Sequence, residues 1–121
     1  MLKGVGLDLC QIERFKEHLT AETFLKKIFS AAELAYCLNQ ADSASSLAAR
    51  FAAKESLIKA LSPAKVLVEL KFLEVALNED GSPYWLINNE LEALLKQARV
   101  NRLHLSLSHE AGVAVAITIA E

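Results

Sequence analysis

The sequence predicts an α+β fold built on an antiparallel β-sheet, and three observations lead to this prediction. An apolar strand opens the chain, several helical segments follow it, and paired strands with one further helix close it. Strands and helices do not alternate as in βαβ proteins, and no glycine-rich phosphate loop follows a strand. The length of 121 residues, without an internal repeat or linker, fits one domain over residues 1–121.

The chain is apolar for its size, because 53% of its residues are hydrophobic and its mean hydropathy is +0.25. An oligomer interface could bury the additional apolar side chains, since obligate interfaces are as hydrophobic as the core of a domain. No apolar run approaches the roughly 20 residues that span a bilayer. We therefore expect no membrane partner.

The formal net charge of −2 does not indicate wholesale nucleic-acid binding. Residues 1–65 hold nine Lys or Arg against seven Asp or Glu, whereas residues 66–121 hold four against eight. This uneven distribution permits an acidic partner to dock on the first half of the chain.

The two cysteines, Cys10 and Cys37, match no metal-binding spacing and are too few for a disulfide framework. The small number of cysteines is typical of proteins in a reducing compartment, and we expect a cytoplasmic protein. The N-terminus offers Lys3 but no apolar stretch with a small-residue cleavage site, so export is not expected.

The first strand is predicted over residues 2–9, where side chains alternate between two faces. One face carries Val5, Leu7 and Leu9, and the other carries Gly4, Gly6 and Asp8. Because glycine weakens a strand, we interpret the two glycines as clearing space around the carboxylate of Asp8.

Three helical segments are predicted next. Ile12, Phe15 and Leu19 mark the first, and the apolar cluster within residues 24–29 marks the second. The segment Ser30-Ala-Ala-Glu33 is a capping box, in which the serine and glutamate side chains bond the free N–H groups at the start of the third helix.

The most informative segment is residues 50–61, which read Arg-Phe-Ala-Ala-Lys-Glu-Ser-Leu-Ile-Lys-Ala-Leu. A helix here would bury the stripe formed by Leu47, Phe51, Ile58 and Leu61. The neighbouring stripe holds Ala48, Ala52, Glu55 and Lys59, so a carboxylate and an ammonium group share a face with small side chains. Ser45 or Ser46 is expected to cap this helix, and Ser62-Pro63 is expected to end it.

The remaining chain is predicted to form two hairpins and one helix. Strands are expected over residues 70–77 and 84–87, around a turn in which Gly81 can adopt positive φ. Asn88 or Asn89 caps the helix. The last hairpin has one face of large apolar side chains and one of small residues, and we take the small face as support for an oligomer.

Asp8, Glu55 and Lys59 together suggest a site for a metal ion and a phosphate. Two plainer interpretations exist. Glu55 and Lys59, four residues apart, could form an ordinary surface pair worth about 0.3–0.5 kcal/mol. Asp8 could cap a helix that follows the strand.

The motifs resemble those of the holo-acyl-carrier-protein synthases, the short, trimeric group of 4′-phosphopantetheinyl transferases. The resemblance rests on Gly4-Val-Gly-Leu-Asp8 and Arg50-Phe-Ala-Ala-Lys-Glu-Ser-Leu-Ile-Lys59. It extends to Ile12-Glu-Arg-Phe15, Phe29-Ser-Ala-Ala-Glu-Leu34, Asn78-Glu-Asp-Gly-Ser-Pro-Tyr84 and Leu105-Ser-Leu-Ser-His109. It therefore spans essentially the whole chain in the same order.

The resemblance implies a fold with helices packed on one side of the antiparallel sheet. It implies transfer of the phosphopantetheine arm of coenzyme A to a serine of an acyl carrier protein, with release of adenosine 3′,5′-bisphosphate. Asp8 and Glu55 match the carboxylates that hold Mg²⁺, and Lys59 matches the lysine that would stabilise the leaving phosphate. Glu55, directly or through a metal-bound water, is the leading candidate to accept the serine proton.

Other matches concern the nucleotide and the carrier. Ser108 and His109 match a family segment near the nucleotide, and Pro83, with Asn78, matches a turn that borders the adenine pocket. Arg14 lies where the family presents basic residues to the acidic carrier. Each has a plainer interpretation, namely a solvated hairpin tip for His109, a stable turn for Pro83 and a solvated charge for Arg14.

Lys54 and Arg50 are expected to meet phosphate or a partner subunit. The chain departs from the family at Ala60-Leu-Ser-Pro-Ala-Lys65, where relatives have a glycine-rich loop and where Lys65 could supply a charge instead. The leading hypothesis is a Mg²⁺-dependent transferase that forms a homotrimer with sites between subunits, and the carrier could belong to fatty-acid or another biosynthesis. The alternatives are a non-catalytic relative that binds carrier protein or coenzyme A without turnover, and a structural oligomer that binds neither.

Overall fold

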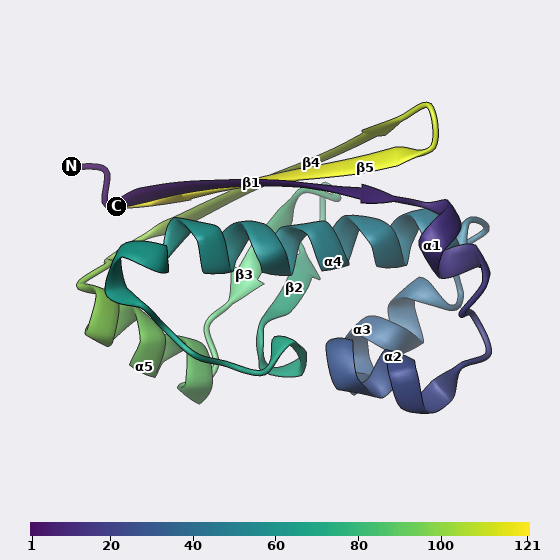
Figure 1. Cartoon of the computed structure of the whole chain (residues 1–121), viewed down its shortest axis with the longest axis horizontal. Helices are drawn as coiled ribbons and strands as arrows, with labels where there is room; N and C mark the ends of the chain where they lie inside the picture. The colour runs from purple at the N-terminus through teal and green to yellow at the C-terminus, as the bar shows by residue number, and fades with distance from the viewer.

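Helix α4 (Ser43–Ala60) runs beneath a three-stranded antiparallel sheet, as Figure 1 shows. The sheet has the order β1-β5-β4, with β1 over Gly4–Gln11, β5 over Val113–Ala120 and β4 over Leu103–Glu110. The other helices and a two-stranded sheet lie on the same side as α4. The structure, a computed structural model, describes residues 1–121. It confirms the α+β class and the antiparallel pairing, with the strands divided between two sheets.

Helix α4 begins earlier than the sequence pattern predicts, because Asp42 is its N-cap. One carboxylate oxygen of Asp42 accepts a hydrogen bond from the backbone N–H of Ser45 at 3.1 Å, and the other accepts one from the Ser45 hydroxyl at 2.6 Å. These bonds lower the pKa of Asp42. The prediction that Ser45 or Ser46 caps the helix is wrong, since a carboxylate three residues before Ser45 already serves the free N–H groups. The helix ends at Ala60, as predicted.

Strand β1 lies close against α4 because it carries glycine where the two elements meet. A Cβ atom added to Gly4 would lie 1.9 Å from the carbonyl oxygen of Ala60, and one added to Gly6 would lie 1.8 Å from that of Ser56. The two glycines therefore permit close approach of backbones. This corrects the interpretation that they clear space around Asp8.

The two faces of the three-stranded sheet have opposite roles. The small residues of β5, namely Ala114, Ala116, Thr118 and Ala120, are buried on the side of α4. The outer sheet face carries the large side chains of Val5, Leu7, Leu9, Val113, Val115, Ile117 and Ile119. Of these, Val5, Leu7 and Leu9 are 55%, 56% and 65% exposed. The small residues of β5 that we took as support for an oligomer thus lie in the core. They share that face with Leu103, Leu105 and Leu107 of β4, so the predicted division of the last hairpin into one large apolar face and one small face is wrong.

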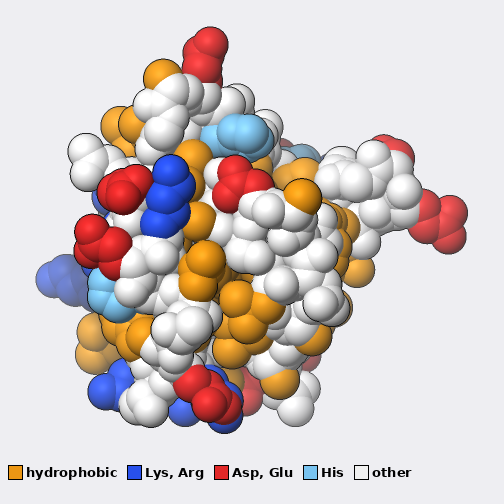
Figure 2. Space-filling model, turned by 90° about the vertical axis from the view of Figure 1, so that its right-hand side faces the viewer, with side chains coloured by type: hydrophobic (Ala, Val, Ile, Leu, Met, Phe, Trp, Pro, Cys, Tyr) orange, Lys and Arg blue, Asp and Glu red, His pale blue; other side chains and the backbone are white.

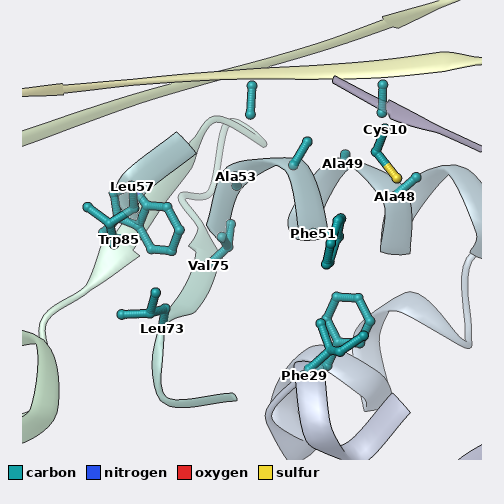
Figure 3. Close-up of a cluster of buried hydrophobic side chains, with 14 of the residues drawn as sticks. Cys10, Phe29, Ala48, Ala49, Phe51, Ala53, Leu57, Leu73, Val75 and Trp85 are labelled. Carbon is teal, nitrogen blue, oxygen red and sulfur yellow. The ribbon is translucent and has the colours of Figure 1, made fainter. Parts of the chain in front are cut away.

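Aromatic side chains hold the N-terminal helices against α4. The ring centroid of Phe15, in α1 (Glu13–Lys16), lies 5.7 Å from those of Phe29 and Phe51. Figure 3 shows Phe51 pointing from α4 towards Phe29, which follows α2 (Glu22–Ile28). This cluster packs α1 and the end of α2 against the middle of α4.

Helix α3 (Ala31–Cys37) opens with the predicted capping box. Ser30 Oγ accepts a hydrogen bond from the Glu33 N–H at 3.2 Å, and the Ser30 N–H donates to Glu33 Oε1 at 3.0 Å. Replacing Ser30 by alanine is expected to lower the free energy of unfolding by about 1 kcal/mol in urea denaturation, because a helix N–H loses its partner. The matched control is Ser62→Ala, since the Ser62 side chain is exposed. Equal losses in the two variants would contradict the role of the cap.

Glu33 also forms a buried ion pair with Lys54 of α4. Both side chains are 0% exposed, and Lys54 Nζ lies 2.6 Å from Glu33 Oε1. The ammonium group also donates to the carbonyl oxygens of Leu70 and Leu73, while Glu33 Oε2 accepts from the Val75 N–H at 3.0 Å. Burial lowers the pKa of Lys54, and the charge of Glu33 opposes that shift. The expectation that Lys54 meets phosphate or a partner subunit is therefore wrong.

The two-stranded sheet pairs β2 (Glu74–Leu77) with β3 (Pro83–Leu86). The first of these strands starts later than predicted, because Leu70–Phe72 form a 3₁₀ turn. Gly81 has a φ of +86°, as the turn prediction required.

Helix α5 (Asn89–Ala98) begins at Asn88, whose side chain accepts a hydrogen bond from the Leu91 N–H at 2.9 Å. Of the two asparagines predicted as caps, Asn88 is thus the one used. Among the helices of this chain, none combines the length and the apolar character needed to cross a membrane.

Candidate functional site

Asp8 and Lys59 form an ion pair where β1 passes over α4. Lys59 Nζ donates to Asp8 Oδ1 at 2.9 Å and to the carbonyl oxygen of Leu7 at 2.9 Å. The Asp8 side chain is 18% exposed and that of Lys59 is 54% exposed. Asp8 caps no helix, because Ile12 occupies the N-cap position of α1. Lys59 pairs with Asp8 and not with Glu55, so both plainer interpretations of these residues are wrong.

Glu55 lies one helical turn before Lys59 on the same stripe of α4 and is half-buried. The packing of β1 places it relative to Asp8. Gly4 meets Ala60 and Gly6 meets Ser56, so each two-residue step along β1 corresponds to about one turn back along α4. Continued by one step, this register places Asp8 opposite Ala52, in the turn of α4 that ends at Glu55.

The carboxylates of Asp8 and Glu55 have oxygens that no protein donor uses. Asp8 Oδ2 accepts no hydrogen bond, and neither oxygen of Glu55 takes part in a hydrogen bond or an ion pair. No group of three or more His, Cys, Asp or Glu side chains gathers anywhere in the structure. Two carboxylates without a complete protein cage suit Mg²⁺, which retains waters and usually binds through one or two carboxylates plus substrate phosphates. The donor set therefore fits the ion.

Ser108 and His109 lie at the end of β4 and line a different feature, a groove of about 440 Å³. Tyr36, Ser46 and Gly81 also line this groove. The predicted turn residues lie close by, because Asn78 bonds across the turn to Ser82 and Pro83 begins β3. The structure thus brings the 78–83 turn and the β4 end together.

Arg50 lies beside the same groove and lacks a full set of partners. Its side chain is buried, its Cζ lies 4.6 Å from the ring centroid of Tyr36, and its Nη1 donates to Ser46 Oγ at 3.1 Å. Its Nε has no hydrogen-bond partner, and no carboxylate pairs with the guanidinium. A buried, incompletely paired guanidinium is a planar donor that suits two oxygens of an anion such as phosphate. Sequence reasoning missed Tyr36 and Ser46, because nothing in the chain order indicates that α3 and α4 meet at this point.

The two sets of site residues do not share one groove within a single chain. Asp8 lies on β1 and Ser108 and His109 lie on β4, the two outer strands of the sheet, with β5 between them. Neither Glu55 nor Lys59 lines the groove that holds Ser108 and His109.

Arg14 is exposed on α1, with its Cζ 4.7 Å from the ring centroid of Phe51. Lys16 of the same helix pairs with Glu13 at 3.4 Å. Figure 2, which views this end of the molecule, shows acidic and basic side chains interspersed around apolar atoms. The surface around α1 is therefore mixed in charge and not a uniformly basic patch.

The segment that departs from the family pattern forms a 3₁₀ turn, Ser62–Ala64, after α4. Lys65 follows it with a φ of +52°, in the left-handed region that glycine adopts most readily. The Lys65 side chain is exposed and forms no ion pair. Its ammonium group is thus available to a phosphate at the C-terminal end of α4.

Comparisons with known proteins show the family of this chain. A model of the 4′-phosphopantetheinyl transferase superfamily matches residues 4–118. The holo-[acyl-carrier-protein] synthase of Halothermothrix orenii is 34% identical, over 100% of this chain and 98% of that protein. The synthase of the same name from Myxococcus xanthus is 40% identical, over 98% of this chain and 94% of that protein.

Among solved structures, the Helicobacter pylori holo-[acyl-carrier-protein] synthase in complex with coenzyme A has a TM-score of 0.78 and 26% identity to this chain. The similarity covers 97% of this chain and 99% of that one. The fold and the site define a phosphopantetheinyl transferase, and the chain belongs to the 4′-phosphopantetheinyl transferase superfamily.

Proposed function

We propose that residues 1–121 form one catalytic domain that transfers 4′-phosphopantetheine from coenzyme A to a serine of an apo acyl carrier protein. The products are the holo carrier and adenosine 3′,5′-bisphosphate. The observation that carries this proposal is the Asp8–Lys59 ion pair beside a helical turn bearing Glu55, within a chain that matches the transferase family over residues 4–118. The holo-[acyl-carrier-protein] synthases that resemble this chain support the choice of carrier and donor.

Asp8 and Glu55 would hold Mg²⁺ through oxygens that have no protein partner. When bound, this ion supplies positive charge that neutralises the pyrophosphate of coenzyme A. Glu55 accepts the proton of the carrier serine as the serine oxygen bonds to the β-phosphorus. The bond from that phosphorus to the nucleotide phosphate breaks, and the Lys59 ammonium stabilises the negative charge left on adenosine 3′,5′-bisphosphate.

The test is an incubation of the protein with coenzyme A, Mg²⁺ and a panel of apo carrier proteins from fatty-acid and other biosynthetic pathways. Intact-mass spectrometry should find one carrier, or more, heavier by one phosphopantetheine group. The serine that carries the group should be identified in the digested product. No mass gain on any carrier would contradict the transferase proposal.

A second candidate is a relative that binds carrier protein or coenzyme A without turnover, and the 60–65 segment favours it. Its Lys65 takes a backbone conformation suited to glycine. The two candidates differ in one measurement, because calorimetric binding of coenzyme A without modification of any carrier would support the non-catalytic one. The paired Asp8 and Lys59 argue for catalysis, since a binding protein does not need them.

A homotrimer with sites between subunits is part of this proposal. The Asp8 set lies at one edge of the sheet and the Ser108 set at the other, so one ligand can contact both sets where two chains meet. The outer sheet face offers an apolar surface for such contact. In this arrangement Ser108, His109 and Pro83 of one chain bind the nucleotide, and Arg14 contacts the acidic carrier. The cytoplasm is the compartment in which we expect these partners.

Leu7→Lys is expected to dissociate the oligomer, because a charge would replace an apolar side chain on the outer sheet face, midway along β1. Sedimentation velocity should find a monomer, and transfer activity should fall although Asp8 is unchanged. The control is Leu67→Lys, since Leu67 is 93% exposed and lies outside this face. If Leu7→Lys keeps the assembly state of the parent chain, the interface lies elsewhere.

A further inference from the structure

We infer that Gly6 is a positioning residue for the transfer reaction, because its missing side chain sets how closely Asp8 and Glu55 can approach one cation. The inference rests on the metal site proposed above. It concerns the spacing between β1 and α4, and not the chemistry of either carboxylate.

The contact at Gly6 involves backbone atoms alone. A Cβ atom at this position would lie 1.8 Å from the carbonyl oxygen of Ser56, 2.8 Å from its carbonyl carbon and 2.7 Å from the nitrogen of Ala60. Backbone atoms inside a helix cannot rotate away as a flexible side chain can. To restore even the 3.0 Å that real Cβ atoms keep, β1 and α4 would have to move apart by more than 1 Å at this point.

Buried hydrogen bonds hold the helix in place opposite Gly6. Ser56 Oγ lies 2.7 Å from Thr118 Oγ1, and the Trp85 indole N–H donates to the same threonine oxygen at 3.3 Å. Thr118 is the residue of β5 that pairs with Gly6. These bonds hold α4 against the sheet at the position of Gly6. No space is therefore left between β1 and α4 for a side chain at Gly6.

The two proposed metal ligands lie next to this contact. Asp8 is two residues beyond Gly6 on β1, and Glu55 immediately precedes Ser56 on α4. Any separation of β1 from α4 at Gly6 moves these carboxylates apart. Mg²⁺ demands near-ideal geometry at about 2.0–2.1 Å from its oxygen ligands, so a shift of 1 Å is large for this ion.

The test uses Mn²⁺ as a paramagnetic probe of the folded protein with no coenzyme A present. In the parent chain, Mn²⁺ should broaden the NMR signals of Asp8 and Glu55 together at one concentration. In Gly6→Ala, the apparent dissociation constant should rise about 10- to 100-fold, as for groups that orient metal ligands.

Two further variants separate positioning from loss of stability. In Gly4→Ala the added Cβ would clash equally closely with the backbone of Ala60, but two residues farther along β1 from Asp8. This variant should weaken Mn²⁺ binding less than Gly6→Ala does. Leu25→Ala shortens a buried side chain in α2, which lies away from this contact, and should leave Mn²⁺ binding unchanged. If Gly6→Ala does not fold, Gly4→Ala must still bind Mn²⁺ more weakly than Leu25→Ala.

Equal Mn²⁺ affinity in the parent chain and a folded Gly6→Ala would overturn the inference and leave the proposed function intact. If Gly6→Ala does not fold, equal affinity in Gly4→Ala and Leu25→Ala overturns it. Absence of broadening at Asp8 and Glu55 in the parent chain would instead overturn the metal site, and the positioning role with it.

Discussion

Replacing Glu55 by glutamine is expected to slow phosphopantetheine transfer about 10³-fold, within the range for loss of an acid–base group or of an electrostatic stabiliser. Glutamine keeps the size of the side chain but can neither accept the serine proton nor offer a negative charge to a cation. Because Glu55 forms no hydrogen bond or ion pair, the fold loses nothing that the glutamate supplied. The free energy of unfolding should change by less than about 0.5 kcal/mol.

Single-turnover assays with coenzyme A and an apo carrier would measure this effect, with urea denaturation run on the same samples. The matched control is Glu90→Gln, an exposed glutamate in the first turn of α5. It should retain full activity. Undiminished transfer by Glu55→Gln would exclude Glu55 from the chemistry.

Replacing Lys54 by methionine is expected to lower the free energy of unfolding by about 3–5 kcal/mol, the cost of breaking a buried ion pair by removing one partner. The variant would leave the Glu33 carboxylate buried without its counter-ion. It would also remove the donor shared by the carbonyl oxygens of Leu70 and Leu73. The loss should appear as a lower urea midpoint with an unchanged slope.

The control for this variant is Lys26→Met. Lys26 pairs with Glu22 at the surface and is 63% exposed, so its removal should change stability by less than about 1 kcal/mol. A double variant, Glu33→Leu with Lys54→Met, should regain part of the loss because it leaves no lone buried charge. A cost below 1 kcal/mol for Lys54→Met alone would show that the pair does not hold the core together.

Local sequence patterns predicted the features that depend on neighbouring residues. The capping box at Ser30, the positive φ of Gly81 and the end of α4 near Pro63 all follow from short-range chemistry. The alternating faces of β1 were also predictable, since a strand has a period of two. Which face of β1 would be buried was not, because that depends on the element packed against it.

The errors concern contacts between distant segments. Lys54 was expected at a binding surface, yet it pairs with a glutamate 21 residues earlier in the chain. The glycines of β1 were assigned to the carboxylate, yet they meet the backbone of α4. Arg50 and Tyr36 come together only because α3 and α4 pack side by side. No periodicity within one segment encodes such pairings.

We propose that Asp8 and Glu55 hold one divalent cation and that the transfer requires this cation. The most direct measurement is the mass of an apo carrier incubated with coenzyme A and metal-stripped enzyme while Mg²⁺ is titrated in. We expect no modified carrier before Mg²⁺ is added and full conversion afterwards. Asp8→Asn should require far more Mg²⁺ than the parent chain. Conversion that is complete without Mg²⁺, or an Asp8→Asn titration that matches the parent chain, would contradict this proposal.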